Sequence, residues 1–421
     1  MKLFSDPWAQ VFGCVALLSG ALSVHAYGFP QIKLPALKLP AMGKLPLGGL
    51  PRVKSGGKWL VDPAGGGDAK TINEAVKAAK PGDSIELAPG VYTEAVSIDK
   101  ALTIKAQGAG ASTIESPGGT AVLVRGGPVS FWGVAVTLAS SKGAAFWVAR
   151  GTVSFSSGKI SGGDTALLVE GAGSALTLSD AQLSGGGRGL DISSAWVSVD
   201  GCEFTGGSES GVRARDRARL FASKSRFVGN GRGVLAVDGA KAELRDSTIS
   251  GATLAGLSAA RGAEISDSGS SIEGGGGPGV YADERSMIKL DRTTIARARS
   301  DGAHLAKQSM MVMHKVKITE PGGAGVIVTQ GSEAFFSDSE VKGGARCGIE
   351  VYSNSSASLD RARINENQCG VGFYGEGRLQ SQDGDFTGNA KGPLVYAERW
   401  KSKIFLKGNG NQPDGFQELF R

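Results

Sequence analysis

The stretch GVYADERSMIKLDRTTIARARSD, residues 279–301, runs directly into GAHLAKQSMMVMHKVKITEPGGA, residues 302–324, and both follow one pattern. Each begins with a glycine, carries apolar or small residues one and three positions later, and has an isoleucine sixteen positions after the glycine. The pattern returns every 22 to 24 residues along most of the chain. Its marker residues are Gly143, Thr165, Gly189, Gly211, Gly233, Gly256, Gly279, Gly302, Gly325, Gly348, Gly370 and Gly392.

The alternation after each marker is typical of a strand with one buried face. A repeat this short has no room for a long helix and must stack on its neighbours to bury its apolar positions. It lacks the leucine pattern of leucine-rich repeats and is too short for a propeller blade. We therefore predict an all-β fold, a single-stranded parallel β-helix of about 13 coils. Its second apolar column is Leu183, Phe204, Phe227, Ile249, Ile272, Ile295, Ile318, Val341, Ile364 and Phe386, preceded by a ladder that includes Cys202, Ser225, Ser247, Ser270, Thr293 and Ser339.

A stacked array also needs covered ends, because terminal coils expose apolar side chains and strand edges. Residues 71–80 read as an N-terminal capping helix that Pro81 and Gly82 bring to an end. At the other end, residues 416–420 could form a short amphipathic plug. The apolar face of the capping helix consists of Ile72, Ala75, Val76 and Ala79.

The stretch TINEAVKAAKPGDSIELAPGVYTEAVSIDKALTIKAQG, residues 71–108, resembles the opening of pectin methylesterases and of the wider pectin-lyase-like superfamily. The similarity lies in the cap helix, the P-G-D turn and the G-V-Y-T-E strand end. It implies a right-handed β-helix from a superfamily that commonly engages polysaccharides. The catalytic motifs of its esterases, polygalacturonases, epimerases and pectate lyases are absent, so no catalytic residue is carried over.

The first part of the chain differs in composition from the repeats. An apolar run over residues 11–24 is too short to span a bilayer, and Val24-His25-Ala26 is a passable cleavage signal. A signal peptide implies export to the periplasm, the cell surface or the extracellular space. We predict a signal peptide over residues 1–26, a Pro-rich basic linker over 27–57, the β-helix domain over 58–410 and a C-terminal cap or tail over 411–421.

The formal charge of +6 is concentrated just after the predicted signal peptide. Residues 27–58 carry six basic residues and no acid, so the rest of the chain sums to zero. A neutral domain offers no broad basic surface, which argues against nucleic acid as a partner. The linker repeats a Lys-Leu-Pro unit at Lys33, Lys38 and Lys44, and is either a spacer or a tether to an anionic envelope surface.

The cysteines test the register of the coils. Cys347 and Cys369 each stand one residue before a marker glycine in consecutive coils, which predicts a disulfide between stacked turns. The alternative is a pair of free thiols. Cys202 falls in the ladder of small residues and is expected to be a core residue. No C-x-x-C or His-rich cluster is present, so we expect no metal site and no cofactor.

Candidate functional residues lie on the outward positions of the strand that follows each marker. Tyr352, Tyr374 and Tyr396 stand four positions after successive markers and predict an aromatic ladder that, with Glu350, would bind carbohydrate. The alternative is cross-strand stacking that only stabilises the sheet. On the same face, His304, Tyr281, Glu350 and Asp283 are the candidates for an acid, a base or a substrate contact in an enzyme.

Together these features favour an exported, non-catalytic β-helix that binds polysaccharide or acts as a rigid cell-envelope element. A divergent polysaccharide lyase, hydrolase or esterase is the second hypothesis. An adhesive rod with a protein partner is the third. The sequence leaves open whether the protein is an enzyme.

Overall fold

The computed structural model describes residues 22–23, 33–34, 57–352, 354–396 and 404–407. The chain divides into two units, Met1–Leu47 and Gly48–Arg421. In the first, β1 (Leu22–Ser23) and β2 (Lys33–Leu34) form an antiparallel pair. Most of the predicted signal peptide and linker, and the predicted tail 411–421 with its plug, lie outside the described residues. No helix in the described ranges has the length and hydropathy to cross a bilayer.

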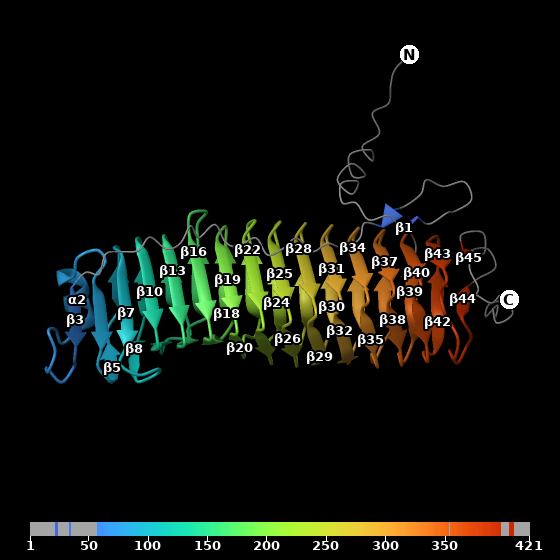
Figure 1. Ribbon diagram of the computed structural model, residues 1–421. Helices are drawn as coiled ribbons and strands as arrows, with labels where there is room; N and C mark the ends of the chain where they lie inside the picture. The colour runs from blue at the N-terminus through green and yellow to red at the C-terminus, as the bar shows by residue number, and fades with distance from the viewer. Residues whose placement is uncertain (1–21, 24–32, 35–56, 353, 397–403, 408–421) are drawn as a thin grey trace, which may run out of the picture. The chain divides into compact units, whose positions relative to one another are not determined.

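The second unit is a right-handed parallel β-helix, as predicted, whose strands stack in chain order from β3 to β45 (Figure 1). Three sheets form its walls. Sheet I contains β3 (Lys58–Val61), β4 (Ser84–Leu87), β7 (Leu102–Ala106), β10 (Pro128–Trp132), β13 (Thr152–Ser156), β16 (Ala175–Ser179), β19 (Trp196–Asp200), β22 (Arg219–Ser223), β25 (Lys241–Arg245), β28 (Glu264–Ser268), β31 (Met287–Asp291), β34 (Met310–His314), β37 (Glu333–Ser337), β40 (Ser356–Asp360), β43 (Arg378–Gln382) and β45 (Ile404–Lys407).

Sheet II contains β5 (Gly90–Thr93), β8 (Ser112–Ser116), β11 (Val134–Leu138), β14 (Lys159–Gly162), β17 (Gln182–Ser184), β20 (Glu203–Thr205), β23 (Arg226–Val228), β26 (Thr248–Ser250), β29 (Ser271–Gly275), β32 (Thr294–Ala298), β35 (Lys317–Thr319), β38 (Glu340–Lys342) and β41 (Arg363–Asn365). Sheet III contains β6 (Val96–Ile98), β9 (Val122–Val124), β12 (Ala144–Val148), β15 (Thr165–Glu170), β18 (Arg188–Ser193), β21 (Ser210–Arg215), β24 (Arg232–Ala236), β27 (Ala255–Ala259), β30 (Val280–Ala282), β33 (Ala303–Leu305), β36 (Val326–Val328), β39 (Cys347–Tyr352), β42 (Cys369–Tyr374) and β44 (Leu394–Tyr396).

The β-helix makes about 15 turns, whereas the sequence predicted about 13. The difference arises because turns before Gly143 stack without a marker glycine. The predicted capping helix is present as the short α2 (Ile72–Ala78), which a capping box of Thr71 and Glu74 begins. All four residues of its predicted apolar face are buried, namely Ile72, Ala75, Val76 and Ala79.

The marker glycines are required by close packing between two walls. A Cβ atom at Gly233 would lie 2.6 Å from Ile249 Cγ2 and 2.7 Å from the carbonyl oxygen of Gly256 on the next turn. The second apolar column therefore packs directly against the glycine column. The marker glycines from Gly189 to Gly370 do not have the positive φ that glycine favours at turns. Other members meet the same pair of obstacles, including Gly256, Gly279, Gly302, Gly325 and Gly348.

The register corrects three marker positions. Pairing of Phe146, Leu167 and Leu190 places Ala145 and Ala166 in the column, instead of Gly143 and Thr165. At the other end, Val371 pairs with Leu394, so Pro393 instead of Gly392 follows Gly370. The sequence pattern misled here because glycines also occur in the preceding turns, where Gly143 and Gly392 have positive φ.

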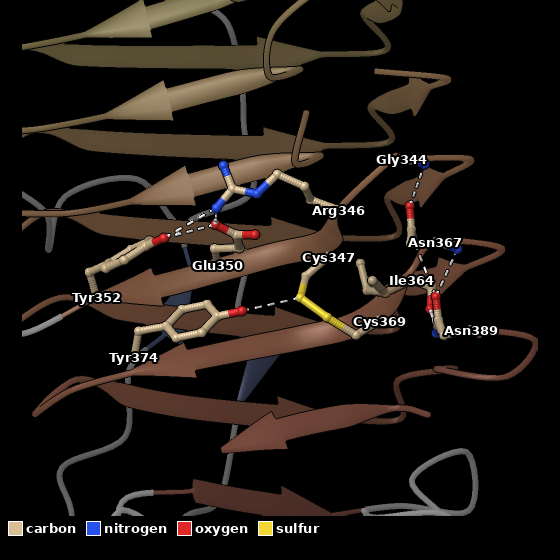
Figure 2. Close-up of a disulfide and its surroundings, with 10 residues drawn as sticks. All are labelled: Gly344, Arg346, Cys347, Glu350, Tyr352, Ile364, Asn367, Cys369, Tyr374 and Asn389. Atoms are coloured by element: carbon tan, nitrogen blue, oxygen red, sulfur yellow. Dashed lines mark hydrogen bonds and ion pairs between the residues drawn. A yellow bond between two sulfur atoms is a disulfide. The ribbon is translucent and has the colours of Figure 1, made fainter. Parts of the chain in front are cut away.

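Polar ladders tie successive turns together at the corners. The backbone N–H groups of Cys202, Ser225 and Ser247 donate to the hydroxyl of the next ladder serine at 3.1 to 3.2 Å. This bonding explains the column of small polar residues, since it satisfies backbone donors that would otherwise be buried and unpaired. At another corner, Gly344 N–H donates to Asn367 Oδ1, and Asn367 N–H donates to Asn389 Oδ1 (Figure 2).

One carboxylate lies among the apolar side chains of the core. Asp267 in β28 pairs in register with Leu244 and Leu290 and is fully buried. Thr293 Oγ1 donates to its Oδ2 at 2.5 Å, whereas Oδ1 has no hydrogen-bond partner among the described residues. Burial raises the pKa of Asp267 to about 6. A charge at this position is therefore destabilising at neutral pH.

The glycine column gives a stability prediction. We expect Gly233→Ala to lower the free energy of unfolding by about 1 to 3 kcal/mol, because the added methyl group must displace Ile249 or the next turn. Urea unfolding measures the loss. Gly173→Ala is the matched control, since a Cβ atom there meets nothing within 4 Å. Equal effects of the two substitutions would contradict the packing argument.

Asp267 gives a prediction on pH dependence. Because its native pKa of about 6 lies above the ordinary 3.8, the native state keeps a proton that the unfolded chain has lost. Asp267 therefore does not affect the free energy of unfolding below about pH 3.8. Between pH 3.8 and about pH 6 it lowers that free energy increasingly, and above pH 6 the loss is constant. Near neutral pH we expect Asp267→Asn to raise the free energy of unfolding by up to about 3 kcal/mol, measured by urea unfolding. The difference from the wild type should decrease as the pH falls. A variant that is less stable than the wild type near neutral pH would refute this.

Candidate functional site

The outward positions of sheet III bring the predicted site residues onto one face. Tyr281 pairs with His304, His304 with Ile327, Ile327 with Glu350, and Glu350 with Gly372. The predicted order of these residues along the face thus corresponds to direct neighbours on successive turns. Two positions further along the strands, Tyr352 pairs with Tyr374.

Glu350 is the buried centre of a polar cluster. Only 1 % of its side chain is exposed, whereas 47 % of the Arg346 side chain is exposed. Arg346 Nη2 donates to Glu350 Oε2 at 2.5 Å, and the Tyr352 hydroxyl donates to the same oxygen at 3.0 Å (Figure 2). Burial raises the pKa of Glu350, and the guanidinium of Arg346 opposes that rise. The carboxylate therefore orients an arginine and a tyrosine whose outer surfaces meet solvent.

The aromatic part of the cluster is the tyrosine pair, Tyr352 with Tyr374. Their rings stack with centroids 5.1 Å apart and planes inclined by 28°. Tyr374 is 36 % exposed, so its ring is open to a ligand. Burial raises the pKa of both phenols, and the nearby Glu350 carboxylate raises them further. The hydroxyls therefore stay protonated at neutral pH and remain able to donate hydrogen bonds.

The third member of the predicted aromatic ladder is wrong. The register pairs Tyr396 with Phe373 instead of Tyr374. The marker position after Gly370 is Pro393, so the last turn is one residue longer than the pattern suggested. The one-residue slip takes Tyr396 out of register with Tyr352 and Tyr374.

A second polar group lies nearer the middle of the same face. The rings of Tyr281 and His304 meet edge to face at 5.6 Å. His304 Nδ1 lies 3.6 Å from Asp301 Oδ2, while Asp301 Oδ1 accepts the backbone N–H of Ala324 at 2.9 Å. Burial raises the pKa of Tyr281. A histidine beside a carboxylate, here His304 and Asp301, is a combination that can transfer protons.

Two of the enzyme candidates are not placed for joint chemistry. Ile327 separates His304 from Glu350, so the two stand two turns apart, on the order of 10 Å along the axis. Asp283 Oδ2 accepts a hydrogen bond from Lys307 Nζ at 2.9 Å, and Oδ1 accepts the backbone N–H of Glu284 at 3.0 Å. Within the described ranges, no group of three or more His, Cys, Asp or Glu side chains could hold a metal ion.

Towards the N-terminal end of sheet III, the outward charges neutralise one another. Arg213 contacts Asp191 at 2.6 Å and Glu209 at 3.1 Å. Arg188 contacts Glu209 at 2.5 Å, and Arg215 contacts Asp191 at 3.4 Å. These side chains are held by one another in ion pairs.

Sequence reasoning missed Arg346, Asp301 and Gly372. The first two lie before the strand that follows the marker, outside the alternating positions that were searched. Their signal was available as charged residues one or two positions before a marker glycine. Gly372 shows its role only in three dimensions, because a Cβ atom there would lie 2.7 Å from Cε2 of Tyr374 and 2.9 Å from Sγ of Cys347.

The cysteines lie beside the tyrosine pair. Cys347 and Cys369 pair in register, with Cα atoms 4.3 Å apart, and their sulfur atoms form a disulfide (Figure 2). With Val395 they make a small apolar cluster separate from the main core. Cys202 is buried and unpaired, and burial raises the pKa of its thiol to about 11.

The family described as "Right handed beta helix region" matches residues 142–273 and 256–409, which is more than half of the chain. The chain belongs to this family. A search of curated proteins finds no significant match. The family defines an architecture, and the architecture agrees with the three sheets described above.

Several solved structures are similar at low identity. A pectate lyase is 15 % identical with a TM-score of 0.42, over 57 % of this chain and 76 % of that one. A mutant of the periplasmic alginate epimerase AlgG is 14 % identical with a TM-score of 0.46, over 80 % and 82 %. Tailspike protein 3 of bacteriophage CBA120 is 12 % identical with a TM-score of 0.43, over 80 % and 56 %. At these values no site residue is carried over from them.

Proposed function

We propose that this chain is an exported β-helix protein that binds a polysaccharide on the outer face of sheet III without cleaving it. The stacked, exposed tyrosine pair beside Arg346 is the observation that carries the proposal. Tyrosine rings offer apolar faces to sugar rings and hydroxyls to their polar edges. Arg346 adds N–H donors that are not spent on Glu350, and these suit sugar hydroxyls or acidic substituents.

The arrangement favours binding over catalysis. Glu350 is buried and already shared between Arg346 and Tyr352, so its role is to hold them. The acid–base candidate His304 stands two turns away, beyond Ile327. An enzyme of divergent type is the second proposal, and the His304 and Asp301 contact is the observation that favours it.

The site prediction concerns the two stacked tyrosines. We expect the combined Tyr352→Ala and Tyr374→Ala variant to lose at least about tenfold in affinity for the glycan that the wild type binds. The melting temperature should fall by only a few degrees, because both rings lie outside the core. A panel of immobilised uronate and neutral glycans measures retention. Trp132→Ala is the matched control, an exposed aromatic residue on sheet I.

The same panel separates the proposals. Retention without new unsaturated ends, reducing ends, methanol or acetate supports binding. Any of these products would establish an enzyme instead. Neither retention nor product would favour an adhesive rod with a protein partner, and unchanged retention of the double variant would exclude the tyrosine surface.

The N-terminal linker is proposed to tether the exported domain to an anionic envelope surface. Lys33, Lys38 and Lys44 supply the charge, and the leucines that follow them supply apolar contact. We expect residues 27–421 to sediment with anionic vesicles at low salt and to be released at high salt. Replacing the three lysines by glutamine should abolish sedimentation at low salt. Salt-insensitive behaviour of both proteins would leave the linker as a spacer.

A further inference from the structure

We infer that the disulfide between Cys347 and Cys369 positions Tyr374, so that the tyrosine surface is competent only in the oxidised protein. The inference rests on the proposed function of that surface and adds its regulation. It makes the site oxidation-dependent through contacts in the ligand face itself, beyond any general stabilisation of the fold.

The first step is the path of the Tyr374 side chain. Its ring folds back along β42 over Gly372, where a Cβ atom would lie 2.7 Å from Cε2 and 3.0 Å from the hydroxyl oxygen. The absence of a side chain at this position is what allows the ring to lie against the strand. Every neighbouring position in this column carries a larger side chain, including Glu350 and Val395.

The second step is the contact at the end of the ring. The Tyr374 hydroxyl lies 3.8 Å from Sγ of Cys347 (Figure 2). A disulfide sulfur has no proton, so the tyrosine is the donor in this contact. The ring is thus bounded by Tyr352 on one side, Gly372 below and the disulfide at its tip.

The third step concerns the residues that the bond holds. The disulfide joins the first residues of β39 and β42, the two strands that carry Tyr352 and Tyr374. Arg346 immediately precedes Cys347 in the chain. A movement of the Cys347 side chain would therefore displace Tyr374, which contacts its sulfur atom. A movement of its backbone would displace Arg346, the preceding residue.

Reduction changes the space that the sulfur atoms occupy. A dithiol reductant breaks the bond, each cysteine sulfur takes a proton, and the reductant closes its own disulfide. Sulfur atoms that are about 2 Å apart when bonded must then separate to about 3.5 Å or more. Cys347 and Cys369 are 2 % and 3 % exposed and are enclosed with Val395. Because the Tyr374 hydroxyl lies 3.8 Å from Cys347 Sγ, we expect the separating sulfur atoms to displace the Tyr374 ring.

The same enclosure limits exchange once the protein has folded. Thiol–disulfide exchange needs access to a sulfur atom, and both are covered. The redox state is therefore set largely when the chain folds. A chain that folds in a reducing compartment would carry an altered tyrosine surface, whereas export to an oxidising one completes it.

Two variants of the full chain separate the bond from its effect. The combined Cys347→Ser and Cys369→Ser variant removes the disulfide. Gly372→Ala keeps both cysteines and crowds the Tyr374 ring at 2.7 Å, although its Cβ atom also comes within 2.9 Å of Cys347 Sγ, so the presence of the bond in this variant is checked by counting thiols after denaturation. We expect both to lose at least about tenfold in affinity for immobilised alginate or polygalacturonate, whichever the wild type binds. Gly173→Ala is the matched glycine control and should bind as the wild type does.

A second readout does not depend on any glycan. With 3-fluorotyrosine placed at position 374, the ¹⁹F resonance should shift in the cysteine variant and in the wild type refolded under dithiothreitol. All measurements are made well below each melting temperature, so that loss of fold is not mistaken for loss of the surface. An unshifted resonance in the folded, reduced protein would overturn the inference.

The two hypotheses fail separately. If the wild type binds neither polysaccharide but the resonance shifts, the proposed function fails for these ligands and the positioning stands. If the wild type binds and the cysteine variant binds equally well, the inference fails while the proposed function survives. Loss of binding in the cysteine variant together with unchanged binding in Gly372→Ala would show that the disulfide acts only by stabilising the fold. That result would also overturn the inference.

Discussion

Contact between the glycine column and the second apolar column is the constraint on which this structure depends. Gly233 leaves room for Ile249 on one side and for the carbonyl of Gly256 on the other, and the same arrangement repeats on successive turns. Because both contacts are closer than a side chain allows, each turn has one register in which it fits over the previous turn. Dispersion across this packed interior, added turn by turn, then supplies the stability of the array.

A single register on the inside also determines what the outside presents. Outward residues about two dozen positions apart become lateral neighbours, which is how Tyr352 comes to stack on Tyr374. The array has little tolerance for a slip, as Tyr396 shows. One additional residue before β44 pairs that tyrosine with Phe373 instead of Tyr374. The positions of the outward side chains therefore depend on the packing of the core and on the lengths of the turns.

The chemistry of the surface follows from one buried carboxylate. Glu350 holds Arg346 and Tyr352 with the same oxygen, which orients both without leaving an unpaired charge. Gly372 and the disulfide support Tyr374 from below and at its tip. These supports make a small, preorganised patch near the C-terminal end of a long face, while the charges around Asp191 and Arg213 are occupied with one another. Fixed side chains of this kind favour the binding of a ligand. His304 lies two turns from Glu350 and does not take part in the patch.

The spacing of glycines and apolar residues was enough to predict the architecture, because it reflects a packing rule that successive turns from Gly233 to Gly348 share. It also indicated the capping helix and the column from Tyr281 to Glu350, since these follow from periods that can be read along the chain. The register of Tyr396 and the roles of Arg346, Asp301 and Gly372 became apparent only in the folded chain. Those outcomes depend on the path of the corners and on how side chains fold across neighbouring turns, and neither is encoded in a spacing.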